Sequence, residues 1–371
     1  MKMTETYDVK LICCSPRYFV CSHKGNVYVL DRQEHDIGRN VFSKIPSVDG
    51  IEKISKNALL CRAMRLDARC GIFIDDDSCV ISLRGHIYRI DCRKNAGIRE
   101  HSFRDGMNNP ISFAKIENIT GFENGIYYGE YFGNSNREPV RLFVRTSDGE
   151  WKNWYTFPQN TINHVHRIFA HPYRDSVIVF TGDTDEESAI WEFKGGSGNV
   201  RKVLQGSQQY RACVGFPVGN GIAYATDTPL EPNGLYLYDF TDEIHRKLAD
   251  TDGPAIYGVQ ADPDTFVFST SVEPDSRISR IRYRFTYKLG PGVKNRESHI
   301  YVLKNTTDGV TCKEVFSAKK DILPMLAFQF GTFLFPPVCG RDVFAVGQSI
   351  RHYEHRTINI SDMLGDLKNE R

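Results

Sequence analysis

The sequence lacks an excess of either charge and lacks any long apolar run. Its 47 basic and 46 acidic residues leave a net charge of +1. Proteins that hold nucleic acid by bulk electrostatics are usually strongly basic, so nucleic acid is not expected as a partner. The longest apolar stretch, residues 323–338, contains three prolines and is too short to span a bilayer. We therefore expect no membrane insertion.

Several familiar sequence signals are also missing. Residues 1–11 carry charges and no apolar segment before a cleavage site, so we predict no export signal and a cytoplasmic location. The ten cysteines form no C-x-x-C pair, which favours reduced, buried thiols over a zinc knuckle. The Walker A, G-x-G-x-x-G, G-x-S-x-G and H-E-x-x-H motifs are absent, which disfavours nucleotide-dependent chemistry.

Aromatic and β-branched residues are abundant, and they occur in short runs. The 23 Phe and 18 Tyr residues favour strands, and almost no window has a helical period. Turn residues separate the runs, as in antiparallel proteins, so we predict an all-β fold. The clearest expected strands are Val9–Cys13, Tyr18–Ser22, Asn26–Asp31, Gly71–Ile74, Cys79–Leu83, His86–Asp91, Ile126–Tyr131, Val140–Arg145, Val177–Thr181, Ile190–Phe193, Ile222–Thr226, Leu235–Asp239 and Phe266–Thr270.

A pair of strands that ends in an acidic residue recurs four times. The acidic ends are Glu130, Asp183, Asp227 and Glu273, spaced 53, 44 and 46 residues apart. One four-stranded blade uses about 40–50 residues, so this period predicts a β-propeller. Two β-sandwiches would fit the composition but would not explain the repeated acidic ends.

Continuing the period in both directions predicts seven blades, or six if the N-terminal strands close the last blade. Leu59–Leu66 and Met325–Phe330 are then expected as inner strands of the second and last blades. Residues 1–361 form one propeller domain in this prediction, and 362–371 form a polar tail. The expected blades cover residues 10–55, 58–105, 110–158, 162–206, 210–251, 255–318 and 322–361.

Propeller geometry predicts where a ligand site would lie. The innermost strand of each blade starts on the face where the second strand ends, so both kinds of position surround one mouth of the central channel. Ionisable groups of both signs around one funnel are typical of a polar ligand site. Besides the four acidic ends, the strand starts contribute His164, His166, Tyr210, Arg211 and Tyr257, with Arg62 and Arg65 as further options.

The segment His164-Val165-His166 has the most specific chemistry. Side chains two residues apart on a strand share a face, so the two imidazoles could bind a divalent metal together. One of them could instead act as a base beside a carboxylate, or both could simply join neighbouring blades. The predicted catalytic residues are His164, His166, Tyr257 and Glu273, and the predicted substrate-binding residues are Glu130, Asp183, Arg211, Asp227, Tyr210 and Gln329.

Arginines alternate with apolar residues in the insertion between Arg277 and Lys288. Arg280, Arg282 and Arg284 would share one face of a strand, a pattern that suits an anionic polymer. A solvated outer strand has the same pattern.

One turn resembles a known motif. The segment Ser147-Asp148-Gly149-Glu150-Trp151 resembles a shortened Asp box, the S-x-D-x-G-x-x-W turn of sialidase-like BNR-repeat propellers. Residues 110–340 are similar to sialidase-superfamily-like propellers of unassigned chemistry, and this resemblance implies a carbohydrate-related propeller. The F/Y-R-I-P arginine motif of sialidases is absent, so sialidase activity is not implied.

Polysaccharide lyases built on seven-bladed propellers offer a second comparison. They use His, Tyr and Arg side chains, in some cases with a divalent metal, and His164, His166, Tyr210 and Arg211 match that set. The sequence thus predicts a hydrolase or lyase acting on an acidic oligosaccharide or polysaccharide, connected with surface-polysaccharide metabolism. The alternative is a noncatalytic propeller that binds a glycan or a protein partner.

Overall fold

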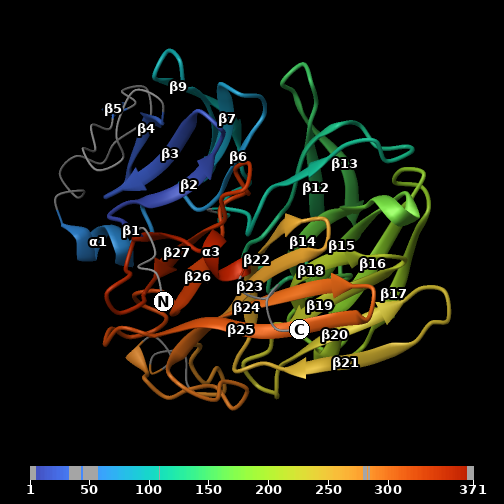
Figure 1. Ribbon diagram of the computed structural model, residues 1–371. Coiled ribbons are helices and arrows are strands. Elements are labelled where there is room, and N and C mark those ends of the chain that lie inside the picture. The colour runs from blue at the N-terminus through green and yellow to red at the C-terminus, as the bar shows by residue number, and fades with distance from the viewer. Residues whose placement is uncertain are drawn as a thin grey trace.

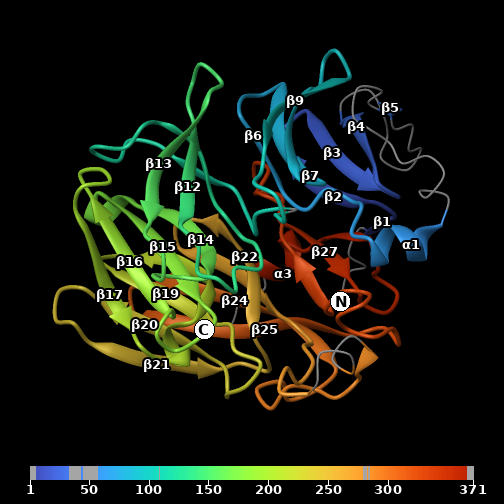
Figure 2. The ribbon, with the colours of Figure 1, turned by 180° about the vertical axis from the view of Figure 1, so that it is seen from behind.

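The chain is a seven-bladed β-propeller, as the repeat predicts. The computed structural model describes residues 6–32, 43–44, 57–107, 109–278, 282 and 285–365. These residues form seven four-stranded antiparallel sheets arranged as blades around a central channel (Figures 1 and 2).

Each blade is a meander in which consecutive strands pair. Blade 1 contains β2 (Lys10–Cys14), β3 (Tyr18–His23), β4 (Asn26–Asp31) and β5 (Ser43–Lys44); blade 2 contains β6 (Gly71–Phe73), β7 (Ser78–Leu83), β8 (His86–Asp91) and β9 (Ala96–Ser102). Blade 3 contains β10 (Ala114–Ile116), β11 (Gly125–Gly129), β12 (Val140–Arg145) and β13 (Trp151–Phe157); blade 4 contains β14 (His164–His171), β15 (Ser176–Gly182), β16 (Ala189–Lys194) and β17 (Val200–Gln205). Blade 5 contains β18 (Ala212–Val218), β19 (Gly221–Thr226), β20 (Gly234–Asp239) and β21 (His245–Asp250); blade 6 contains β22 (Ala255–Asp262), β23 (Thr265–Thr270), β24 (Glu297–Thr306) and β25 (Gly309–Lys319). Blade 7 contains β26 (Thr332–Leu334), β27 (Phe344–Gln348), β28 (Thr357–Asn359) and β1 (Thr6–Tyr7); the helical segments are α1 (Ala58–Ala63), η2 (Pro172–Arg174), η3 (Gln208–Tyr210) and α3 (Ser361–Gly365).

The N-terminal strand closes the ring. Strand β1 pairs antiparallel with β28, with Thr6 opposite Ile358, so the last blade is built from both ends of the described chain. In both ribbon views the blue N-terminal strands lie beside the red C-terminal ones. Closure of this kind completes the seventh blade and does not reduce the count to six.

Two predicted inner strands are wrong. Leu59–Leu66 contains helix α1, which begins because the side chain of Asn57 accepts hydrogen bonds from the backbone N–H groups of Leu59 and Leu60 at 3.0 and 3.2 Å. The inner strand of blade 2 is β6 instead. Met325–Phe330 is also not a strand, since the Phe328 N–H turns back to Pro324 O at 3.0 Å, and the inner strand of blade 7 is β26.

The core lies between neighbouring blades. Every residue of the second strands β15 and β19 is buried, because one face of each blade packs against the preceding blade and the other face against the following one. The outer strands β17 and β21 are half exposed. Close packing needs glycine where blades meet: a Cβ on Gly129 of blade 3 would lie 2.4 Å from Val165 of blade 4.

Two further expectations concern thiols and membranes. All ten cysteines are free, eight of them buried and two half-buried, as the sequence predicts. In the part of the chain that the structure describes, no helix has the length and apolarity needed to cross a bilayer.

Acidification is expected to destabilise the fold through His101. Burial, with Arg141 nearby, lowers the pKa of His101 from 6.5 to about 4, and its Nε2 bonds Tyr128 OH at 2.8 Å. The unfolded chain therefore binds a proton at this residue between pH 6.5 and 4 that the folded chain does not bind. The stability from neutral His101 is complete above pH 6.5 and is lost as pH falls.

Thermal unfolding at pH 7, 6 and 5 tests this expectation. Between pH 7 and 5, the decrease in melting temperature should be smaller for His101→Phe than for the wild type. His352→Gln, which alters an exposed histidine, should show the same decrease as the wild type. Equal pH dependence in all three proteins would contradict the role of His101.

Candidate functional site

A cavity of about 500 Å³ opens at the channel mouth where inner strands begin and second strands end. Lys10 begins β2 and His164 begins β14, while Asp183 and Asp227 directly follow β15 and β19. The structure thus brings strand starts and two of the four acidic ends, Asp183 and Asp227, together at this mouth.

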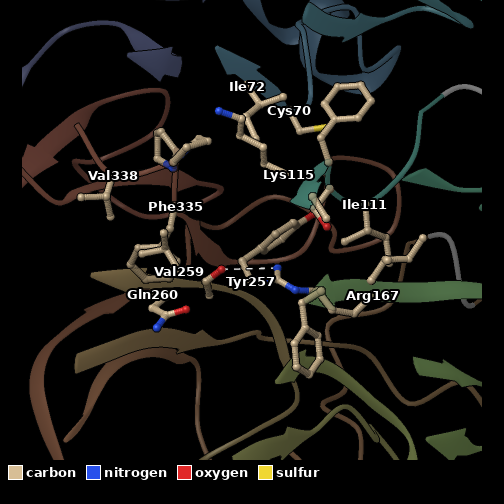
Figure 3. Close-up of a pocket in the computed structure, with 18 of the residues that line it drawn as sticks. Cys70, Ile72, Ile111, Lys115, Arg167, Tyr257, Val259, Gln260, Phe335 and Val338 are labelled. Atoms are coloured by element: carbon tan, nitrogen blue, oxygen red, sulfur yellow. Dashed lines mark hydrogen bonds between the residues drawn. The ribbon is translucent and has the colours of Figure 1, made fainter. Parts of the chain in front are cut away.

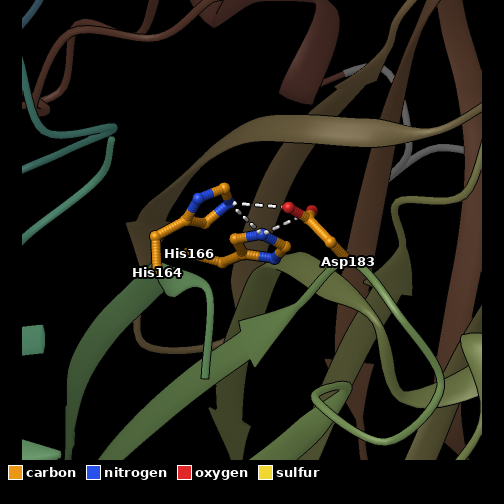
Figure 4. A group of neighbouring side chains, drawn as sticks. All are labelled: His164, His166 and Asp183. Atoms are coloured by element: carbon orange, nitrogen blue, oxygen red, sulfur yellow. Dashed lines mark hydrogen bonds and ion pairs between the residues drawn. The ribbon is translucent and has the colours of Figure 1, made fainter. Parts of the chain in front are cut away.

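A histidine pair and a carboxylate form a compact cluster on one wall of this cavity. The Nε2 atoms of His164 and His166 lie 3.1 Å apart. Each also faces one carboxylate oxygen of Asp183, at 3.4 Å from His164 and 3.5 Å from His166 (Figure 4). Gly182, just before Asp183, makes room, because a Cβ there would lie 2.6 Å from Cε1 of His166.

The backbone determines which imidazole nitrogens are free. Nδ1 of His164 lies 3.1 Å from the carbonyl oxygen of Phe132, and Nδ1 of His166 lies 3.2 Å from that of Ala212. A carbonyl only accepts hydrogen bonds, so each Nδ1 carries the proton and each Nε2 presents a lone pair. Burial lowers the pKa of His166, which favours its neutral form.

These lone pairs and the carboxylate fit a divalent cation. Neutral imidazoles and a carboxylate would repel one another unless a positive charge lay among them. The 3.1 Å between the two nitrogens matches the separation of about 3.0 Å for neighbouring ligands at about 2.1 Å from one ion. Carbonyl-held histidines are the usual arrangement around bound metals. His164, His166 and Asp183 therefore form one group that could hold such an ion.

The backbone of Asp183 is strained and heavily supported. Its φ of 117° lies in the left-handed region, which costs a non-glycine residue about 1–3 kcal/mol. Asn163 Nδ2 donates to its carboxylate, and Arg211 Nη2 lies 3.3 Å from Oδ1. Burial alone would raise the pKa of Asp183, but the facing imidazoles lower it well below its ordinary value when they carry protons at Nε2 in the absence of a cation. The strain positions a charged carboxylate opposite the imidazoles.

Two further carboxyl groups interact with Asp183 and Arg211, and one of them, Asp227, also lines the cavity. Asp227 accepts from Cys213 Sγ at 3.2 Å and lies 3.8 Å from Arg211 Nε, while Glu273 accepts from Ser271 Oγ at 2.5 Å. Burial raises the pKa of Asp227 to about 8, with Arg211 opposing and Glu273 reinforcing the shift, and burial also raises the pKa of Glu273. A carboxyl group that holds its proton near neutral pH can serve as a general acid.

Cationic side chains line other parts of the same cavity. Arg69 Nη2 donates to Tyr257 OH at 2.8 Å. Lys10 is buried, and burial lowers the pKa of its ammonium group, with Asp67 opposing that shift. Among the described residues, no carboxylate pairs with Lys10, Arg65 or Arg69. This wall could receive an anionic ligand.

Other predicted residues have different surroundings. The Glu130 carboxylate is buried and pairs with Arg141 at 2.6 Å and Arg104 at 3.3 Å, away from the cavity lining. Tyr210 packs against His245, with ring centroids 5.6 Å apart, and also does not line the cavity. Neither predicted residue therefore lines this cavity.

Four further predicted positions also differ in their surroundings. Tyr257 and Gln329 line the cavity, and Gln329 Nε2 donates to the Arg62 carbonyl at 3.2 Å. The Arg62 side chain is buried and contacts Asp321 at 2.5 Å and Ser349 at 2.7 Å. It therefore links helix α1 to the segments that contain these two residues. Arg211 faces protein carboxylates, which leaves little of its charge for a substrate.

The arginine-rich insertion is only partly described. Arg277 and Lys288 both pair with Asp275, at 2.8 and 2.9 Å, which neutralises part of the predicted cationic face. Arg280 and Arg284 lie outside the described residues. Arg282 is exposed and not in a strand.

Lys10 and Arg69 were missed by sequence reasoning. Both lie at or just before an inner strand, β2 and β6, which is the same signal that identified His164. Because the inner strand of blade 2 was expected at Leu59–Leu66, its predicted start gave Arg62 and Arg65 as candidates instead of Arg69.

Comparisons with known proteins identify the fold and no closer relationship. No protein-family model and no curated protein sequence matches the chain. The resemblance of residues 147–151 to an Asp box therefore has no further support; the segment forms the turn between β12 and β13.

Solved structures match over nearly the whole chain. An oligogalacturonate lyase in complex with manganese has a TM-score of 0.56 at 13% identity, covering 95% of this chain and 89% of that one. An oligogalacturonate lyase from Vibrio parahaemolyticus has a TM-score of 0.53 at 12% identity, covering 96% and 90%. A chain of a mitotic checkpoint complex has a TM-score of 0.51 at 9% identity, covering 95% and 89%. The TM-scores show that this chain shares their fold, and at such low identities the similarity shows the fold alone.

Proposed function

We propose that the protein is a divalent-cation-dependent enzyme that cleaves acidic oligosaccharides by β-elimination, in the manner of a polysaccharide lyase. The observation that carries the proposal is that His164 and Asp183, two members of the cluster with His166, line the same cavity as Arg65 and Arg69. A uronate substrate carries carboxylates that both kinds of site would attract.

The cation and the arginines have complementary tasks. His164, His166 and Asp183 would hold the cation, which would supply positive charge to stabilise a substrate carboxylate as negative charge develops beside it. Arg65 and Arg69 bind substrate carboxylates and orient the sugar rings in the mouth.

Lys10 and Asp227 carry the protons in this proposal. The Lys10 amine takes the proton from the carbon next to the carboxylate, and the C–H electron pair becomes a C=C bond. The neighbouring C–O glycosidic bond breaks, and the protonated Asp227 carboxyl gives its proton to the leaving oxygen. The lowered pKa of Lys10 and the raised pKa of Asp227 suit these directions of transfer.

The structural neighbours support the choice of probes. Two of them are oligogalacturonate lyases, and one was solved with manganese. Mn²⁺ and oligogalacturonates are therefore the first cation and substrate to use. The cytoplasmic location and the connection with surface polysaccharides stay predictions from the sequence.

An assay with two readouts tests the reaction class. The protein with Mn²⁺ is incubated with oligogalacturonates, and both new reducing ends and ultraviolet absorbance of the C=C bond are measured. One C=C bond for each new reducing end supports elimination. New reducing ends without ultraviolet absorbance would indicate hydrolysis and contradict the proposal. Neutral oligosaccharides of the same length are the control. Binding of the acidic oligosaccharide without any product would favour the noncatalytic alternative.

A further inference from the structure

A second cavity, of about 590 Å³, occupies the other end of the channel. It is lined by the later parts of inner strands and by the turns that follow them, from Phe169 of β14 to Val259 of β22 (Figure 3). Lys10, Arg69, Ile111 and Tyr257 line both cavities, so the two meet at these residues.

The walls of the second cavity are apolar, and its charges have one sign. Aromatic and aliphatic side chains make most of the lining, and no described lining residue is acidic. The cationic residues of the lining are Lys10, Arg69, Lys115 and Arg167. Lys115 pairs with Glu117 at 3.0 Å, but none of the carboxylates that the structure describes pairs with Arg69 or Arg167.

Arg167 has few partners for a guanidinium with five N–H donors. Its Nη1 makes one long contact, 3.5 Å, with the carbonyl oxygen of Gly258. Its Nε is buried without a hydrogen-bond partner, as is Nε of Arg69. Burial lowers the pKa of Arg167 to about 10, which still leaves the group charged at neutral pH.

Arg167 is half-buried with its Nε shielded from water, and a cation in such surroundings without a counter-ion is costly unless a ligand supplies the charge. The ligand that fits must be anionic where it meets Arg167 and apolar over most of its surface. A sugar acid suits these walls poorly, because its hydroxyl groups would lose hydrogen bonds to water. The volume lies in the usual range for small-molecule sites.

We propose that this second cavity binds a small carboxylate with an aromatic or aliphatic body. The carboxylate lies against Arg167 and Arg69, and the body packs among Phe113, Phe169, Phe216 and Phe335. This site lies beyond the proposed function: the two cavities share Arg69, but Arg167 and the four phenylalanines do not line the first cavity.

Titration calorimetry with 4-phenylbutyrate tests the proposal. We expect binding to the wild type, with 4-phenylbutyramide, galacturonate and inorganic phosphate each binding at least about tenfold more weakly. Arg167→Met should reduce 4-phenylbutyrate affinity about tenfold or more, as expected for losing a charged hydrogen bond. Arg65→Met, which removes a cation from the first cavity only, and Lys115→Met, which removes an ion-paired cation, should bind as the wild type does.

A steric variant protects the test against misfolding. Ala170→Phe adds bulk to the lining of the second cavity and leaves Arg167 in place, so it should also weaken 4-phenylbutyrate binding. Mn²⁺ affinity at the first cavity should stay unchanged in both Arg167→Met and Ala170→Phe. The proposal is overturned if 4-phenylbutyrate fails to bind the wild type at millimolar concentration. It is equally overturned if Arg167→Met and Ala170→Phe bind it normally, or if Arg65→Met abolishes binding.

Discussion

Replacing His166 with alanine is expected to lower the affinity for Mn²⁺ by at least about 100-fold, because losing an outer partner of a metal ligand already costs 10–100-fold. His166 Nε2 lies 3.1 Å from His164 Nε2 and 3.5 Å from Asp183, so its removal takes one of three converging ligand atoms. His164→Ala should have the same effect. Titration calorimetry and the metal content after dialysis measure the loss.

A pair of neighbouring aspartates gives the matched control for this experiment. Asp183→Asn removes the ligand charge and should weaken Mn²⁺ binding strongly. Asp185→Asn changes an exposed carboxylate that contacts Gln208 and not the imidazoles, so it should bind Mn²⁺ normally. If His166→Ala and Asp183→Asn bind Mn²⁺ as tightly as the wild type, the cluster serves only to join the blades.

Replacing Asp227 with asparagine is expected to lower kcat on acidic oligosaccharides by about 10²–10⁴-fold, the usual contribution of a general acid. Asparagine keeps the size of the side chain but has no acidic proton to donate. Asp227 is buried between Cys213 and Arg211, and burial raises its pKa to about 8. The wild type therefore still holds this proton at neutral pH.

The pH profile separates proton transfer from a structural role. Activity needs protonated Asp227 and should fall as pH rises through about 8. It also needs neutral Lys10 and should rise with pH through the lowered pKa of that group, so kcat/KM should be bell-shaped. Asp227→Asn should lose the alkaline decline and keep the acidic limb. An unchanged alkaline limb in Asp227→Asn would assign the acid role to another group, Glu273 first.

The architecture was readable from the sequence because it depends on a local period. Alternating apolar residues, turns every few residues and acidic ends 44–53 residues apart are properties of each blade by itself. The same period placed His164 and Asp183 at one mouth. The errors at residues 59–66 and 325–330 arose where a capping asparagine and a turn after a proline override an apolar run.

The partners of the charged groups were decided only by the tertiary structure. Glu130 occupies the same repeat position as Asp183, Asp227 and Glu273, yet its carboxylate is neutralised by Arg141 on the next strand and by Arg104 from the preceding blade. Nothing in the repeat distinguishes these four acids.

The surroundings of Arg167 also could not be predicted from the sequence. The residue follows His166 in the sequence, but it faces a different cavity, in which none of the described lining residues is acidic. Strand period and blade number follow from short-range patterns that each segment carries alone. Whether a charge is neutralised, shared or left for a ligand depends on side chains that meet only when seven blades close around the channel.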